Sequence, residues 1–302
     1  MQSHLVPGAR FVDPKVLARV KDLELLARSV VDGFINGLHR APYFGASIDF
    51  AEHRGYVAGD DIRRVDWRLY ARTDKYFVKQ YEADTNANFA VLLDVSRSMG
   101  FASQGLSKLE YGKFLAACLA YLSHKQRDRV GIITFDEKVV THVPTSAKHF
   151  NVLLHTLDQA KPERQGRLLE NIKMLAEHFR RRSIVALISD LYENPEDLLD
   201  ALKPYSFLGN DLVVFHVLDP AEIEFPYTDA SRFEDLESGE VVPVVPEVFA
   251  DQYRKMMQEH IEAIRSKCSE SRIDYVLLNT SKPLDEALFA YLGNRERLMR
   301  VR

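Results

Sequence analysis

An apolar segment that ends abruptly in polar residues is the feature that most constrains this chain. Residues 89–93 (Phe-Ala-Val-Leu-Leu) are followed at once by Asp94, Ser96 and Ser98 in an Asp-x-Ser-x-Ser pattern. A short Val- and Leu-rich run bounded in this way is typical of a buried strand in a parallel sheet. In open α/β sheets, ligands bind just outside the carboxyl ends of such strands. Because alternate residues of an extended segment point to the same side, the three polar side chains are expected to converge at the edge of a sheet.

A second segment repeats this design. Residues 183–188 (Ser-Ile-Val-Ala-Leu-Ile) form a short apolar run that ends in Ser189 and Asp190. If the two strands are neighbours, Asp190 lies near Asp94. Carboxylate and hydroxyl oxygens are the ligands that hard divalent cations prefer, so Asp94, Ser96, Ser98 and Asp190 form a candidate Mg²⁺ or Mn²⁺ site. The alternative is that both aspartates cap the helices that follow them.

Composition places the chain among ordinary globular proteins. It has 302 residues, 46% of them hydrophobic, and a net charge of −4, which suits one large domain or two. The near-neutral balance argues against general nucleic-acid binding. The apolar runs are too short for a transmembrane helix and the first residues lack a signal-peptide pattern, so we expect a cytoplasmic protein. Two isolated cysteines, Cys118 and Cys268, are expected to be reduced thiols in the core.

The pattern along the chain predicts two domains. Residues 1–85 contain a helical segment at 14–38 and then a charge-rich stretch, which predicts an N-terminal module of helix and charged β-type structure. In residues 86–302, strands alternate with helices, which predicts a mostly parallel sheet flanked by helices. Residues 219–246 follow a strand end and are rich in Pro, Glu and Asp, so we expect an insertion here. Within it, Glu237-Ser-Gly-Glu240 predicts a turn between two short strands.

These residues resemble two known protein groups. The segment from about residue 89 to 292 resembles the von Willebrand factor type A fold, in which Asp-x-Ser-x-Ser opens the metal-ion-dependent adhesion site. The segment before it carries Gly59-Asp60-Asp61-x-Arg63-x-x-Asp66-Trp67 and resembles the signature of the bacterial family called domain of unknown function 58. This resemblance implies an α/β fold of the von Willebrand type. It also implies a non-enzymatic adaptor that acts with a MoxR-type AAA+ ATPase, chaperone-like, in assembling or activating other proteins.

One position departs from the pattern of the family. The family fold completes its metal site with a Thr on a loop that corresponds here to residues 163–168, and Arg167 stands where that Thr is expected. Its guanidinium is expected to pair with Asp94 or Asp190 and to fill the place of the cation. A partner's acidic residue would then bind either to the metal or directly to Arg167.

Asp60 and Asp61 are further candidates for partner binding, because a Gly-Asp-Asp turn presents carboxylates. The alternative is that they belong to a structural network of ion pairs, since acids and bases are nearly balanced in this block.

The alternative function is a metal-dependent, phosphatase-like hydrolase with Asp94 as the nucleophile. Such enzymes usually place a general acid two residues further on, where this chain has Ser96. The chain also lacks the Gly-x-Ser-x-Gly, P-loop and Gly-x-Gly-x-x-Gly motifs. The sequence therefore favours a binding protein over an enzyme.

Overall fold

The computed structural model describes residues 22–38, 53–55, 67–79, 87–179, 182–229, 231–285, 287–289 and 291–292. The chain divides into two compact units, Met1–Arg10 with Gly33–Thr85 and Phe11–Asp32 with Asn86–Arg302. Residues 11–32, which the sequence placed in the N-terminal module, are thus grouped with the larger unit. The division into domains at 1–85 and 86–302 stays a prediction.

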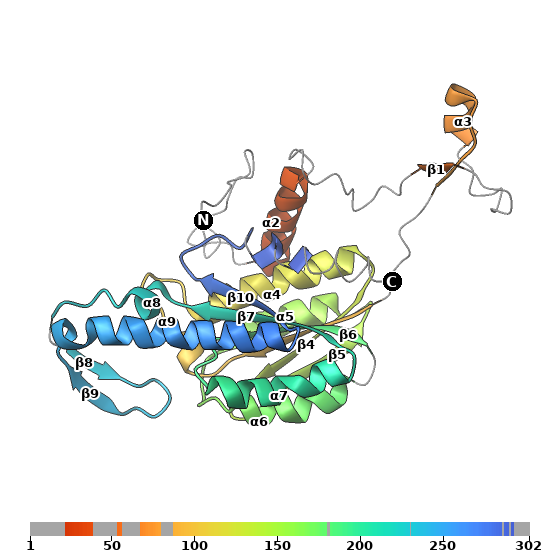
Figure 1. Cartoon of the computed structure of the whole chain (residues 1–302). Helices are drawn as coiled ribbons and strands as arrows, with labels where there is room; N and C mark the ends of the chain where they lie inside the picture. Colours follow the sequence, from red (N-terminus) through yellow and green to blue (C-terminus); the bar gives the residue numbers. More distant parts are fainter. Residues whose placement is uncertain are drawn as a thin grey trace. The chain divides into compact units, whose positions relative to one another are not determined.

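The larger unit is built on a six-stranded sheet of order β10–β7–β6–β3–β4–β5 (Figure 1). The strands are β3 (Asn88–Asp94), β4 (Arg129–Phe135), β5 (Val139–Ser146), β6 (Ser183–Ser189), β7 (Asp211–Leu218) and β10 (Asp274–Asn279). Neighbouring strands are parallel except at the edge, where β5 runs antiparallel to β4. The mostly parallel sheet expected from the alternation of strands and helices is therefore confirmed.

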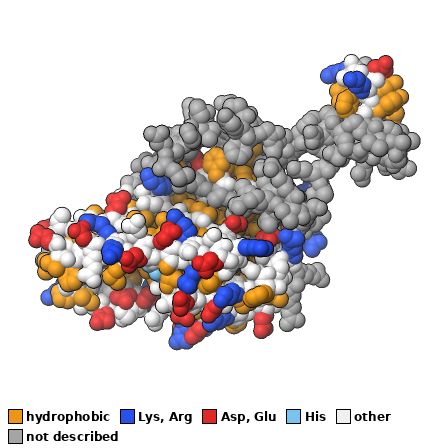
Figure 2. Space-filling view, viewed as in Figure 1, with side chains coloured by type: hydrophobic (Ala, Val, Ile, Leu, Met, Phe, Trp, Pro, Cys, Tyr) orange, Lys and Arg blue, Asp and Glu red, His pale blue; other side chains and the backbone are white. Residues whose placement is uncertain are grey.

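Helices cover both faces of this sheet. They are α4 (Lys108–Lys125), α5 (Phe150–Gln159), α6 (Leu168–Leu175), α7 (Pro195–Phe207), α8 (Pro220–Glu224) and α9 (Pro246–Glu270), with 3₁₀ turns η2 (Ser98–Gly100) and η3 (Ala176–His178). Figure 1 shows α4 and α5 on one side of the sheet and α6, α7 and α9 on the other. Charged side chains of both signs alternate along the outer face of α9 (Figure 2), which marks it as a solvated surface.

The helices that follow β3 and β6 begin with their own caps. Ser107 and Glu110 form a reciprocal capping box at the start of α4. Asn194 caps α7 and is followed by Pro195, a residue that suits the first helical position. The alternative that Asp94 and Asp190 cap these helices is therefore wrong, and both carboxylates are available for other contacts.

Alternate residues of β3 pack against opposite layers. Ala90 and Leu92 belong to the core cluster shared with α6, α7 and α9. Leu93 faces α4, where a Cβ added at Gly112 would lie 3.3 Å from Leu93 Cδ1 and 3.2 Å from Ile188 Cγ2. Gly112 therefore lets the backbone of α4 lie close against the two central strands.

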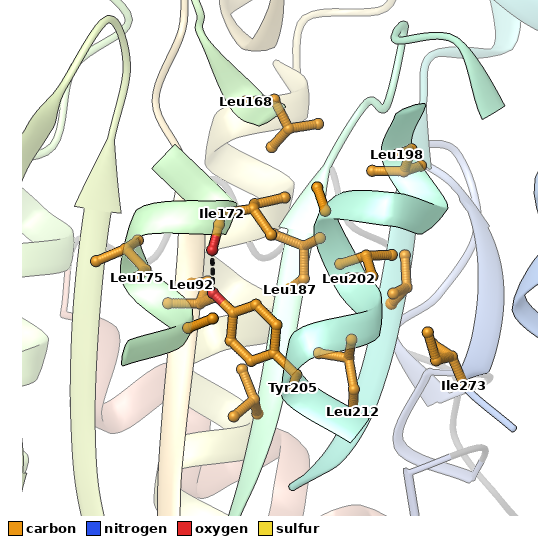
Figure 3. Packing of buried hydrophobic residues seen from close by; sticks show 14 of the residues in the cluster. Leu92, Leu168, Ile172, Leu175, Leu187, Leu198, Leu202, Tyr205, Leu212 and Ile273 are labelled. Carbon is orange, nitrogen blue, oxygen red and sulfur yellow. Dashed lines mark hydrogen bonds between the residues drawn. The ribbon is translucent and has the colours of Figure 1, made fainter. Parts of the chain in front are cut away.

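Tyr205 makes a buried polar contact within this apolar core. Figure 3 shows its ring among the leucines of α6 and α7, and its hydroxyl donates to the carbonyl oxygen of Ile172 at 2.8 Å. The same carbonyl also accepts from the backbone N–H of Ala176. The hydrogen bond from Tyr205 thus joins α7 to α6, and the Ile172 carbonyl keeps a second donor.

Substituting Tyr205→Phe is expected to lower the free energy of unfolding by about 0.5–1.5 kcal/mol, because one neutral hydrogen bond is lost and no carbonyl is left unpaired. Urea denaturation followed by circular dichroism measures the change. Phe207→Leu on the same helix is the control, since Phe207 is 86% exposed. Equal stability of the two variants would contradict a stabilising role for the hydroxyl.

The two cysteines are buried and unpaired, as the sequence predicted. Burial raises the pKa of Cys268 to about 12 and that of Cys118 further still, an effect to which Asp285 also contributes. Neither thiol is thus ionised near neutral pH in the folded protein.

A thiol-reactive dye is therefore expected to label neither cysteine in the native protein at about pH 8, and to label both in urea. Mass spectrometry of the labelled chain provides the count. Rapid labelling of Cys118 without denaturant would show that α4 is less well packed than the structure indicates.

The insertion after β7 folds as predicted. After α8, strands β8 (Ser231–Glu234) and β9 (Val241–Val244) pair as an antiparallel hairpin. The turn closes through a hydrogen bond from Asp235 N to Glu240 O, and Gly239 adopts the positive φ of 74° that the turn requires. Figure 1 shows the hairpin beside the start of α9.

The described part of the N-terminal region is small. The helix predicted at 14–38 is described from Leu23 to Leu38 as α2, and residues 14–21 of that prediction lie outside the described residues. Strand β1 (His53–Gly55) pairs antiparallel with β2 (Phe77–Lys79). Between them, α3 (Trp67–Thr73) contributes Trp67 and Tyr70 to a cluster of rings with Tyr76. Asp60 and Asp61 lie outside the described residues. Among the described helices, none has the length and apolar character that would be needed to cross a membrane.

Candidate functional site

The carboxyl ends of β3 and β6 bring the predicted site residues together. Leu93 pairs with Ile188, so Asp94 and Asp190 leave the sheet from adjacent strands. Ser189 Oγ donates to Asp94 Oδ2 at 2.7 Å, and each aspartate is only 4% exposed. Asp94, Ser96, Ser98 and Asp190 are called the rim site below.

The loop after β3 folds back onto Asp94. The backbone N–H of Ser96 donates to Asp94 Oδ1 at 2.9 Å, which turns the chain into η2. The hydroxyl oxygens of Ser96 and Ser98 then lie 3.1 Å apart. The structure thus places the three oxygen-bearing side chains of the Asp-x-Ser-x-Ser pattern in one cluster.

Burial makes the ionised form of Asp94 energetically unfavourable. Its burial, and then the nearby charge of Asp190, raise its pKa to about 7, although hydrogen bonds from Ser189 and Ser96 act in the opposite direction. Among the described residues, no Lys, Arg or His forms an ion pair with Asp94. A cation placed at the rim site would therefore be attracted to an otherwise uncompensated carboxylate.

Lys108, the first residue of α4, is the cation of this region and was missed by the sequence reasoning. Its side chain is fully buried, and Nζ lies 2.7 Å from Asp190 Oδ2 and 2.6 Å from Glu222 Oε1. Burial alone would lower the pKa of Lys108, but the two carboxylates outweigh burial and raise the pKa. Nζ also lies 4.9 Å from the centre of the Tyr192 ring.

A signal for Lys108 was present in the sequence. The helix dipole disfavours a lysine in the first turn of a helix, so its presence there indicates a specific partner. The partners, Asp190 and Glu222, are distant along the chain and could be identified only from the fold.

Arg167 does not take the position predicted for it. Its guanidinium lies 3.4 Å from Glu170 and 4.0 Å from Glu137, and the side chain is 55% exposed. The expected pairing with Asp94 or Asp190 is therefore wrong, because the backbone N–H of Arg167 is held by the carbonyl of Asp136 and directs the residue elsewhere. A role for Arg167 in partner binding stays a prediction.

Gly166, and not Arg167, is the loop residue that faces the rim site. The chain before it forms a β-bridge from Arg164 to Ser96, which brings the loop close. A Cβ added at Gly166 would lie 2.9 Å from Ser96 Cβ, so a Thr here would collide with Ser96. This loop accordingly contributes a backbone N–H instead of a side-chain oxygen.

That N–H binds a carboxylate from the insertion. Glu237 Oε2 accepts from Gly166 N at 2.8 Å, and Glu237 Oε1 accepts from Ser98 N at 2.8 Å. The sequence placed Glu237 in a turn and did not predict its contact with the rim site. Only the fold of the hairpin brings it there.

The donor set fits a hard divalent cation. Asp94, Ser96 and Ser98 offer oxygen atoms as ligands, and among the described residues the charges of Asp190 and Glu222 together exceed that of Lys108, which pairs with both. Within the described ranges, no cluster of three or more His, Cys, Asp or Glu side chains forms a metal site. A metal held here would therefore depend on the two serine hydroxyls.

Substituting Lys108→Met is expected to lower the free energy of unfolding by about 3–5 kcal/mol, because the buried Asp190 and the largely buried Glu222 are left without their cation. Chemical denaturation measures this loss. Lys113→Met on the same helix is the matched control, since Lys113 is only partly buried.

The triple variant Lys108→Met/Asp190→Asn/Glu222→Gln should recover part of the stability, since it removes the unpaired charges as well. A Lys108→Met protein as stable as Lys113→Met would show that the buried ion pairs contribute nothing net.

Comparison with known proteins identifies similar sequences. The family model described as "Protein of unknown function DUF58" matches residues 52–266. Uncharacterized proteins of Mycobacterium tuberculosis and Mycobacterium bovis are each 30% identical over 234 residues, covering 76% of this chain and 73% of theirs.

One solved structure supports the fold. BatB, a conserved hypothetical protein from Bacteroides thetaiotaomicron, matches with a TM-score of 0.50 and 18% identity, covering 71% of this chain and 99% of that one. The VWA domain of SpRpn10 is also similar, with a TM-score of 0.41 and 13% identity, covering 67% of this chain and 93% of that one.

Proposed function

Because the chain belongs to the DUF58 family and has a von Willebrand factor type A-like α/β fold, we propose that it is a non-enzymatic interaction module that captures an acidic side chain of a partner protein. The rim site is the proposed place of capture. Fold alone does not define a function, so the proposal depends on the chemistry of this site.

The observation that carries the proposal is the buried Asp94 beside two serine hydroxyls. Asp94 has a raised pKa and no cationic partner in the described structure, whereas Asp190 already has Lys108. Carboxylate and hydroxyl oxygens arranged in this way suit Mg²⁺ or Mn²⁺.

Asp94, Ser96 and Ser98 would hold the divalent ion, and Lys108 orients Asp190 near Asp94. The bound ion would supply an open position for a carboxylate. The protein itself excludes water from Asp94 and orients the hydroxyls of Ser96 and Ser98.

We further propose that the partner is a MoxR-type AAA+ ATPase, with which the chain acts in chaperone-like assembly or activation of other proteins. Support for this partner comes from the family resemblance of the segment containing Asp60 and Asp61. These two residues remain candidates for contact with the ATPase.

Titration calorimetry with Mg²⁺ and with Mn²⁺ tests the metal. Saturable binding is expected for the wild type, with none for Asp94→Asn and weaker binding for Ser96→Ala, because the substitutions remove oxygen ligands. Asp158→Asn, an exposed site on α5, is the control and should bind as the wild type does. A wild-type protein that gives no saturable heat would contradict the metal.

Binding to the purified ATPase tests the module itself. Asp94→Asn should weaken the complex, and chelation of divalent ions should do the same. Hydrolysis of a generic phosphate ester that disappears in Asp94→Asn would instead favour the hydrolase.

A further inference from the structure

The tip of the β8–β9 hairpin (residues 235–240) reaches the rim site across a large separation in sequence. Glu237 contacts Ser98 over 139 positions and Gly166 over 71 positions. Both contacts use the carboxylate of Glu237 and backbone N–H groups that lie beside the serine hydroxyls. The carboxylate is thus held at the mouth of the rim site.

The base of the hairpin is anchored independently of this contact. Phe233 stacks on Phe225 with ring centres 5.6 Å apart, and Phe225 lies 4.7 Å from the ring of Tyr253 on α9. Tyr227 joins the same group of rings. Aromatic packing of this kind holds the base in place while leaving the tip to other contacts.

The tip has few other attachments. Among the described residues, its remaining hydrogen bonds stay within the turn, as from Gly239 N to Asp235 O and from Glu240 N to Ser238 Oγ. Leu236 and Glu240, on either side of the contact, are exposed. Glu237 is therefore the side chain through which the tip is attached to the sheet.

The carboxylate of Glu237 is held by backbone N–H donors and not by a cation. It forms no ion pair within the described residues, and Asp94 and Asp190 lie in the same region. Burial raises the pKa of neighbouring Glu193, and Asp190, Asp197 and Glu237 add to this effect. The carboxylate of Glu237 is thus held by its two N–H donors, as an acidic ligand would be.

We propose that Glu237 is an internal ligand of the rim site, occupying the position that the acidic residue of a partner takes. The inference rests on the proposed function. An acidic peptide segment of the partner must displace the hairpin tip before it binds, so the hairpin restrains binding until a matching partner arrives. The partner residue that competes with Glu237 is an exposed Asp or Glu on a turn or extended segment.

Amide hydrogen exchange of the full chain tests the occupancy. Glu237→Gln should accelerate exchange at Ser98 and Gly166 by about tenfold or more, because their N–H groups lose a charged acceptor. Glu240→Gln, an equally conservative change on the same tip, is the control and should leave both amides unchanged.

A peptide probe tests the competition. The probe is a fluorescent peptide of residues 231–244, cyclised through cysteines added at its ends. A control peptide is identical except that Gln replaces Glu237. Binding measured by anisotropy in Mg²⁺ should be about 10- to 100-fold tighter to the Glu237→Ala protein than to the wild type, since the site is no longer occupied. The Gln probe should bind neither protein.

The outcomes separate this inference from the proposed function. If the Glu-containing peptide binds the wild type and the Glu237→Ala protein equally, and the Gln peptide binds neither, the rim site captures carboxylates but Glu237 is not its internal ligand. Unchanged exchange at Ser98 and Gly166 in Glu237→Gln would also overturn the internal ligand. If exchange changes but the peptide binds neither protein, the contact of Glu237 is only structural and the internal ligand is overturned as well. The metal and ATPase binding experiments decide the proposed function separately.

Discussion

The buried ammonium of Lys108 is the interaction on which the geometry of the rim depends. It joins the start of α4 to Asp190 at the end of β6 and to Glu222 in α8. Two carboxylates removed from water would repel each other, and each would be costly to bury without a positive charge. One lysine compensates both, and in doing so it holds three separate segments of the chain at one edge of the sheet.

The same edge is reinforced by another buried acid. Asp219 caps α8, and its carboxylate also accepts hydrogen bonds from the backbone N–H and the hydroxyl of Ser103. The loop between η2 and α4 is thereby tied to the end of β7. Asp94 differs from Asp219 because it lies beside two serine hydroxyls and has no ion pair among the described residues, which is why the proposed binding chemistry centres on it.

Much of this arrangement was predictable because its causes are local. Helix α4 has local causes of this kind, since Ser107 and Glu110 form its cap and apolar residues recur along it. The convergence of Asp94, Ser96 and Ser98 was predicted from the period of an extended chain. In the structure, the turn from Asp94 into η2 brings the three side chains together. The hairpin was predicted from Glu237-Ser-Gly-Glu240, because a Gly in this position permits the turn.

The sequence by itself determined the order of elements, the polar ends of β3 and β6 and the hairpin, because each depends on neighbours within a few positions. Tertiary structure alone decided which charges meet. Arg167 was predicted to approach Asp94, but the Ser96–Arg164 bridge places Gly166 there and directs Arg167 toward Glu170. Lys108 and Glu237 reach the rim from positions far along the chain. Contacts of this kind depend on how strands and helices pack, and no local pattern in the sequence encodes them.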